Sequence, residues 1–285
     1  MEPGIYFDPR ISPDSSRVAL TVVDTDNWDV WIYDLGRHTA NRLTFDPAVE
    51  QRPAWTPDSR RLVFGSDRGG GASNLFWKAA DGTGEVKRLT TSPNDHRAHF
   101  GVDEKTLVFE EDGPETRQDL HLLSMEGEPT SRPLLKTQFT EDRPALSPDG
   151  RWIAYRSNES GQSEIYVRPF PNVEEGKWLI SREGGTSPVW GPDGRELFYR
   201  SLNEEAMMIV RIETEPAFTH GSPQVLFTGS YFRSRNRNYD ISPDGQRFLM
   251  LKEVEQTEET SAPTQDALII VLNWFEELKR LVPTN

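Results

Sequence analysis

The chain has 285 residues, a formal net charge of −14 and a pI near 4.9. This charge argues against nucleic acid and anionic membrane surfaces as partners, because both would repel the protein, and no apolar run approaches the length needed for direct membrane insertion as a helix. The chain has no cysteine and so forms no disulfide, and its length suits a single all-β ring as well as two average domains.

One four-residue signal recurs along the chain. Five copies are read directly from the sequence: Ser12-Pro13-Asp14-Ser15, Thr56-Pro57-Asp58-Ser59, Ser147-Pro148-Asp149-Gly150, Gly191-Pro192-Asp193-Gly194 and Ser242-Pro243-Asp244-Gly245. A degenerate sixth copy is Gly101-Val102-Asp103-Glu104, and successive aspartates are 44 to 51 residues apart. Proline at the second place presets φ for a type I turn, and the aspartate accepts hydrogen bonds from nearby backbone donors.

A short apolar run follows each of these turns, beginning at Val18, Leu62, Leu107, Ile153, Leu197 and Phe248. Such runs are typical of strands buried on both faces, so each turn joins two antiparallel strands. A period in the forties with several strands per unit indicates radial repetition, in which each unit is sandwiched between its neighbours. We therefore expect one all-β domain over residues 1–285, a six-bladed β-propeller of four-stranded antiparallel blades.

In chain order the expected blades cover approximately residues 8–46, 47–92, 93–138, 139–183, 184–229 and 230–272. The last blade is atypical, because a polar, acidic run separates its second strand from its third. After the third strand, Asn273 and Glu276 are the residues of a capping box, and Trp274, Phe275 and Leu278 recur at helical spacing. This pattern predicts a short C-terminal amphipathic helix over 273–282, which either covers exposed core or docks a partner.

Closure of the ring is less clear from the sequence. Ile5-Tyr6-Phe7 is the only candidate for a closing strand, and it sits too close to the first turn. One alternative is a last blade of three strands whose exposed edge is covered by the helix. The other is a chain cut from a longer protein, whose missing segment supplied the closing strand. The first residues lack the length and basic start of a signal peptide, so we expect the cytoplasm for the chain as written, and a periplasmic or other extracytoplasmic location for a fragment.

The repeated turn and its following apolar run resemble the WD40-like (PD40) repeat of the TolB family. That repeat also occurs in propellers attached to peptidases of the prolyl oligopeptidase type and at the C-terminal end of some bacterial serine/threonine kinases. The ending from Asn273 to Leu281 resembles the tail of acidobacterial-type proteins that carry a kinase or DNA-binding domain ahead of such a propeller. The resemblance implies the fold; if it extends to use, a segment of a partner protein inserts into the channel mouth, and the chain is a sensor or interaction domain of a larger bacterial protein.

Candidate binding residues follow from aligning the six units on the turn. The loops that enter the first strands converge on the central channel, and one structural position there holds Asp8, Arg52, Arg97, Arg143, Ser187 and Asn238. An acid stands two residues before each of the three arginines: Glu50, Asp95 and Glu141. In an extended strand that spacing puts both side chains on one side. One hypothesis is therefore a belt of ion pairs that joins neighbouring blades.

The other hypothesis is a basic mouth on an acidic protein, to which Arg237 and its neighbours Arg233 and Arg235 add charge and Tyr239 adds an apolar wall. Guanidinium groups hold oxyanions in a two-pronged manner, so such a mouth suits a carboxylate, a peptide terminus or an anionic sugar. We therefore expect a non-catalytic binding or scaffold propeller that recognises a protein or peptide segment, or a small anionic ligand.

The enzymatic alternative is a channel-centred hydrolase, lactonase or lyase. The Gly-x-Ser-x-Gly stretch of an α/β serine hydrolase does not occur. His96 and His99 are the closest histidine pair, but their separation on a strand points them to opposite sides, which disfavours joint metal binding. One of them, His96, is a candidate for the channel mouth. Asp24-Thr25-Asp26 lacks the glycine and terminal glutamate of an EF-hand loop, and we expect no metal and no cofactor.

Overall fold

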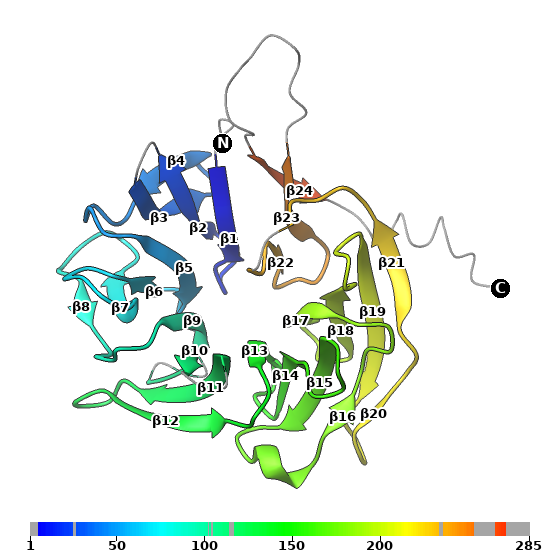
Figure 1. The fold of residues 1–285 in the computed structure, drawn as a ribbon. Coiled ribbons are helices and arrows are strands. Elements are labelled where there is room, and N and C mark those ends of the chain that lie inside the picture. The colour runs from blue at the N-terminus through cyan, green and yellow to red at the C-terminus, as the bar shows by residue number, and fades with distance from the viewer. Residues whose placement is uncertain are drawn as a thin grey trace.

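The structure is a computed structural model that describes residues 5–24, 27–101, 103, 105–113, 117–233, 236–253 and 266–271. Within these ranges every regular element is a β-strand, apart from the short 3-10 helix Val173–Glu175. The strands form antiparallel sheets around a central axis, and the first strand of each sheet lies nearest the centre (Figure 1). The chain is therefore an all-β propeller, and no helix of the described part is long and apolar enough to cross a membrane.

The first three sheets each have four strands in chain order. The first sheet contains β1 (Ile5–Ile11), β2 (Arg17–Asp24), β3 (Asn27–Asp34) and β4 (Thr39–Arg42). The second contains β5 (Glu50–Trp55), β6 (Arg61–Ser66), β7 (Asn74–Ala79) and β8 (Lys87–Arg88). The third contains β9 (His96–Gly101), β10 (Thr106–Gly113), β11 (Arg117–Ser124) and β12 (Thr130–Leu135).

The later sheets differ in their number of strands. The fourth contains β13 (Glu141–Leu146), β14 (Trp152–Ser157), β15 (Glu164–Pro169) and β16 (Trp178–Leu179). The fifth contains β17 (Thr186–Trp190), β18 (Glu196–Arg200), β19 (Ala206–Glu213), β20 (Thr219–His220) and β21 (Gln224–Thr228). The last contains β22 (Tyr239–Ile241), β23 (Phe248–Glu253) and β24 (Asp266–Val271).

The expectation of a six-bladed propeller of four-stranded blades with a C-terminal helix is wrong. The structure has five complete blades, of four or five strands, and within the described ranges the last sheet has the three strands β22, β23 and β24. The complete blades use the chain from Ile5 to Thr228, and the described residues after them supply no fourth strand. The helix expected over 273–282 lies outside the described residues, and those that are described contain no α-helix.

The repeated turns form as predicted, with the aspartate at the centre of each hydrogen-bond pattern. Asp14 Oδ1 accepts from the Ser12 hydroxyl at 2.6 Å and from the Ser16 backbone N–H at 3.0 Å. Burial opposes ionisation, but the hydrogen bonds from Ser12 and Ser16 lower the pKa of Asp14 to about 2. Ser15 occupies the left-handed fourth place at φ 60°, as Ser59 does at φ 58°, and the last three turns have glycine there.

The core lies between neighbouring sheets, because each sheet is covered on both faces. Leu62 and Phe64 of the second sheet are fully buried against Ala19 and Val30 of the first. The last sheet packs on the first in the same way through five buried residues: Tyr6, Val18, Leu20, Leu249 and Leu251. Apolar packing therefore continues around the whole ring.

Hydrogen bonds also join the first sheet to the last, in what we call the ring seam (residues 8–11 and 236–240). The Ile11 backbone N–H donates to Asp240 Oδ2 at 2.9 Å, and Arg10 Nη1 donates to the Arg237 carbonyl at 2.9 Å. Within the described residues, β1 pairs with β2 and the last sheet pairs only within itself. Among these residues the seam is therefore closed by hydrogen bonds that involve side chains.

One carboxyl group is buried at the start of the fourth sheet. Glu141, the first residue of β13, is 1% exposed and accepts a hydrogen bond from the Thr137 hydroxyl at 2.5 Å. Burial raises the pKa of Glu141 from 4.5 to about 7, although the bonds from Thr137 oppose this shift. The folded state therefore keeps a proton there over a pH range in which the unfolded chain has lost it.

Replacement Asp240→Ala is expected to weaken the ring seam by about 1–3 kcal/mol, because it leaves the Ile11 N–H without its acceptor. Urea unfolding measures the loss, and amide hydrogen exchange of β1 should show that this strand opens more easily. The control Asp193→Ala removes a hydrogen bond within an exposed turn and should leave exchange in β1 unchanged. Equal exchange in the two variants would contradict a role for Asp240 in closure.

Glu141→Gln is expected to change the pH dependence of stability. Between pH 4.5 and about 7, the folded state of the natural protein binds a proton at Glu141 that the unfolded state has lost, so stability from this group falls as pH rises. Glutamine removes this loss, and the variant should be more stable than the natural protein by about 2 kcal/mol at pH 8 but not at pH 4.5. Urea unfolding at both pH values tests this, and parallel pH curves for the two proteins would contradict it.

Candidate functional site

Four inner strands have a β-bulge at the predicted binding position, and three of the four bulge residues, Asp8, Arg52 and Arg143, line a cavity near the axis. The bulge residues have φ values of 53°, 57°, 50° and 55° at Asp8, Arg52, Arg143 and Ser187, respectively. At each of them the register with the second strand of the sheet shifts by one residue. Such a bulge interrupts the ladder and re-aims the side chain of the extra residue.

The sequence marks these bulges by the residue that directly follows each bulge residue. A proline follows each of the four: Pro9, Pro53, Pro144 and Pro188. Proline has no N–H to give to the ladder, so inside a sheet it is tolerated mainly at edges and bulges. In the third sheet Ala98 takes its place, and the register there shifts instead between Ala98 and Phe100, at His99.

These inner strands surround a cavity of about 480 Å³, which we call the channel mouth. Among the residues that the structure describes, seven arginines line it: Arg10, Arg52, Arg97, Arg117, Arg143, Arg156 and Arg237. Three acids line it as well: Asp8, Glu110 and Asp142. The lining therefore has an excess of positive charge, whereas the whole chain has a net charge of −14.

Five of the twelve predicted site residues line the channel mouth: Asp8, Arg52, Arg97, Arg143 and Arg237. The other seven are not part of its lining: Ser187, Asn238, Glu50, Asp95, Glu141, His96 and Tyr239. Some of these seven residues form hydrogen bonds with residues that do line the channel mouth. Asn238 Oδ1 accepts from the Asp8 backbone N–H at 3.3 Å, and Ser187 Oγ accepts from Arg143 Nη1 at 3.1 Å. Tyr239 is a buried core residue whose hydroxyl donates to the Ser187 carbonyl at 2.5 Å.

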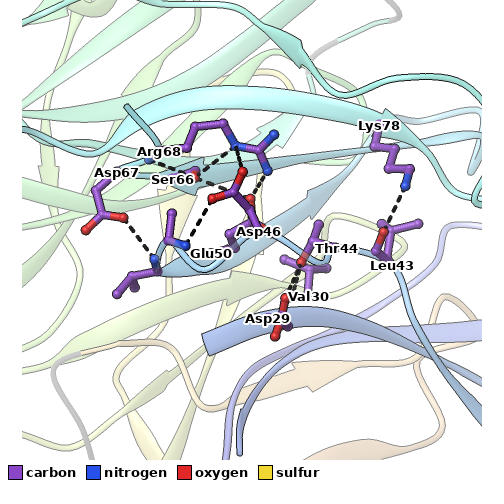
Figure 2. A network of polar contacts seen from close by, with 12 residues as sticks. Asp29, Val30, Leu43, Thr44, Asp46, Glu50, Ser66, Asp67, Arg68 and Lys78 are labelled. Atoms are coloured by element: carbon purple, nitrogen blue, oxygen red, sulfur yellow. Dashed lines mark hydrogen bonds and ion pairs between the residues drawn. The ribbon is translucent and has the colours of Figure 1, made fainter. Parts of the chain in front are cut away.

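The three acids of the expected ion-pair belt have partners other than the arginines two residues after them. Glu50 pairs with Arg68, which also lies near Asp46 (Figure 2). Asp95 Oδ1 accepts from the Ser73 backbone N–H at 2.8 Å, and Glu141 is held by Thr137. The belt is therefore not formed by the pairs that the sequence suggested.

The arginines of the channel mouth are held in two ways. Arg97 and Arg156 pair with Asp112 and Asp142, respectively. Burial alone would lower the pKa of Arg97, but the hydrogen bond to Asp112 raises it overall. Other bonds go to neutral groups: Arg52 Nη2 donates to Asn236 Oδ1 at 2.8 Å, and Arg143 Nη1 donates to the hydroxyls of Thr186 and Ser187.

The second strands also contribute to the channel mouth, which was not predicted from the sequence. Glu110 and Arg156 each stand seven residues after the turn aspartate, and both line the cavity. Thr21 occupies the same place in the first sheet, where its Oγ1 accepts from the Arg52 backbone N–H at 3.1 Å. Extending the alignment past the turn would have found this second ring of inward residues.

The two histidines of β9 have different surroundings. His99 lines the channel mouth, and its Nε2 lies 2.7 Å from Glu110 Oε1. Burial opposes ionisation of Glu110, but His99 and Arg97 hold the pKa of its carboxyl well below the usual range. His96 is buried outside the lining, between Thr90 and Glu111, and burial lowers its pKa. Among the residues that the structure describes, no group of three or more acids and histidines is arranged to hold a metal ion.

The chain is similar to TolB proteins in sequence. The Tol-Pal system protein TolB of Wolinella succinogenes is 25% identical over 171 residues, which cover 58% of this chain and 39% of the relative. The chain spans less than half the length of the curated relatives that it matches.

Solved propellers share the fold. Putative TolB from Agrobacterium tumefaciens has a TM-score of 0.65 at 17% identity, over 85% of this chain and 87% of that one. Oligogalacturonate lyase in complex with manganese has a TM-score of 0.60 at 15% identity, over 93% of this chain and 76% of the lyase. Residues 1–168, more than half of the chain, match the TolB beta propeller domain (PD40). The recurring turn, the ring of antiparallel sheets and this match lead to one conclusion: the chain belongs to the TolB beta propeller domain family.

Proposed function

We propose that the chain is a non-catalytic binding propeller whose channel mouth holds an acidic or carboxylate-bearing segment of a partner protein, or a small anionic ligand. The observation that carries this proposal is the charge of the lining, with seven arginines against three acids in the described part of the chain. On a chain with a net charge of −14, this concentration of guanidinium groups gives the channel mouth a field opposite to that of the rest of the protein. Anions are therefore drawn to one place on the molecule.

Burial favours the binding of an anion by these arginines. Burial, together with the charge of Arg237, lowers the pKa of Arg10 to about 9, and burial also lowers the pKa of Arg52 and Arg143. A buried cation is costly unless an anion compensates its charge. A bound carboxylate would supply that charge and form two-pronged hydrogen bonds with the guanidinium groups.

The similar proteins support a role in which this chain interacts with other proteins. The similar protein of Wolinella succinogenes is named as part of the Tol-Pal system. For this chain we propose a comparable role as the interaction or sensor domain of a larger bacterial protein, with a protein segment as the occupant of the channel mouth.

A channel-centred lyase or hydrolase is the second candidate. One observation favours it: His99 Nε2 and Glu110 Oε1 lie 2.7 Å apart in the channel mouth, and such a pair can transfer protons. The fold is shared with oligogalacturonate lyase. Incubation with oligogalacturonides tests this directly, since formation of unsaturated product by the natural protein but not by His99→Gln would favour the enzyme over the binding propeller.

The double replacement Arg52→Gln and Arg143→Gln is expected to weaken binding of an end-capped hexa-aspartate peptide at least tenfold, because two charge-assisted contacts are lost. Fluorescence anisotropy at low and high salt measures the affinity, which should fall with salt for the natural protein. The control that combines Arg60→Gln with Arg195→Gln removes the same two charges from exposed turns and should bind as the natural protein does. Equal affinity in all three proteins, with similar melting temperatures, would overturn the proposal.

A further inference from the structure

We propose that the part of the channel mouth formed by Asp8, Arg52, Asn236 and Arg237 binds the carboxy-terminal residue of a partner chain. The two arginines hold the terminal carboxylate, and Asp8 accepts a hydrogen bond from the last amide N–H. This inference rests on the proposed function and specifies which part of a partner the channel mouth recognises. We call these four residues the terminus site.

The first observation concerns Asp8. Its side chain lines the channel mouth and the residue is only 1% exposed. Its Oδ2 accepts from Asn236 Nδ2 at 3.3 Å, whereas its Oδ1 is buried and has no hydrogen-bond partner among the described residues. A buried acceptor without a donor is unfavourable, so a ligand that brings an N–H to this oxygen gains free energy.

The second observation concerns the two arginines. Arg52 Nε and Arg237 Nε are buried and lack an acceptor within the described part of the chain. Both side chains line the channel mouth, and their known bonds use other nitrogens: Arg52 Nη2 donates to Asn236 Oδ1, and Arg237 Nη2 lies 3.5 Å from Asp240 Oδ1. The lining of one cavity therefore contains two guanidinium groups that retain a donor and, at Asp8 Oδ1, one acceptor without a donor.

The third observation is that the terminus site is fixed in place before any ligand arrives. Asp8 and Arg52 both occupy bulges with left-handed φ. Asn236 bonds to both side chains, and Arg10 Nη1 bonds to the Arg237 carbonyl. Residues held in this way lose little conformational entropy on binding, which favours selective recognition over general attraction of anions.

The free groups of the terminus site define the ligand chemistry. Two donors and one acceptor require a ligand that has an anionic acceptor and a donor close together. The last residue of a peptide has this arrangement, because one carbon atom separates its carboxylate from its amide N–H. An internal aspartate places its carboxylate at the end of a flexible side chain, and its geometry relative to the backbone N–H is not fixed.

The test uses four peptides with a fluorescent label on the amino end and the sequence Gly-Ser-Gly-Ser-Gly. One ends in a free carboxylate, one in an amide, one in an amide with an internal serine replaced by aspartate, and one in a free carboxylate with the last amide nitrogen methylated. The first peptide is expected to bind at least tenfold more tightly than the aspartate peptide of equal charge. Methylation, which removes the N–H, is expected to weaken binding about threefold to tenfold.

Variants assign the effect to named groups. Arg237→Gln should remove the preference for the free carboxylate, and Asp8→Ala should remove the effect of methylation while part of that preference remains. A double-mutant cycle between Asp8→Ala and the methylated peptide isolates the contact. Arg60→Gln is the matched control and should keep both preferences. Melting temperatures show whether each variant is folded, and Arg237→Gln provides the test if Asp8→Ala does not fold.

Two other results separate this inference from the proposed function. Equal affinity for the free-carboxylate and internal-aspartate peptides, while end-capped hexa-aspartate still binds, would overturn the terminus site and leave the binding propeller intact. An absence of saturable binding for all charged peptides would overturn both.

Discussion

The whole ring depends on the burial of both faces of each sheet by its neighbours. A sheet such as β5–β8 has no polar face to turn to water within the ring, since Leu62, Val63 and Phe64 are buried in succession along β6. Each sheet therefore needs two partners, and the first and last sheets meet this need through each other. Burial also explains the repeated turn, because strands covered on both sides require tight connections whose polar groups are satisfied locally.

The same burial determines where polar side chains can reach solvent near the axis. Inner strands have neighbours on both faces, so polar side chains reach the channel at the inner edges of the sheets, and at Asp8, Arg52 and Arg143 an interruption of the ladder places the side chain there. The proline after Asp8, Arg52, Arg143 and Ser187 interrupts the ladder, and the left-handed residue before each proline is turned out of the sheet. The chemistry of the channel mouth thus follows from a backbone irregularity that the core around it keeps in place.

Much of the fold and part of the site could be predicted from the sequence, and the failures have physical reasons. The turns and the apolar second strands were readable because each uses a local rule. The pairing of Glu50 with Arg52 was predicted from the two-residue period of an extended strand, but Arg52 has a φ of 57°, so the two side chains do not share a side. The number of complete blades could not be obtained from the repeat, because a period fitted to complete blades says nothing about a last unit that departs from it and has the three strands β22, β23 and β24 among the described residues.

The ring seam has a consequence for how an occupant of the channel mouth affects the protein. Asp8, Arg10, Asn236 and Arg237 line the cavity and also connect the two ends of the propeller, which are more than 220 residues apart in the chain. Opening the ring at this point would dismantle the cavity wall, so a molecule that binds only the closed form adds its binding free energy to the work of opening. Occupancy and the mechanical integrity of the ring are therefore thermodynamically linked, and a pull on the two chain ends would be resisted more strongly by the loaded propeller than by the empty one.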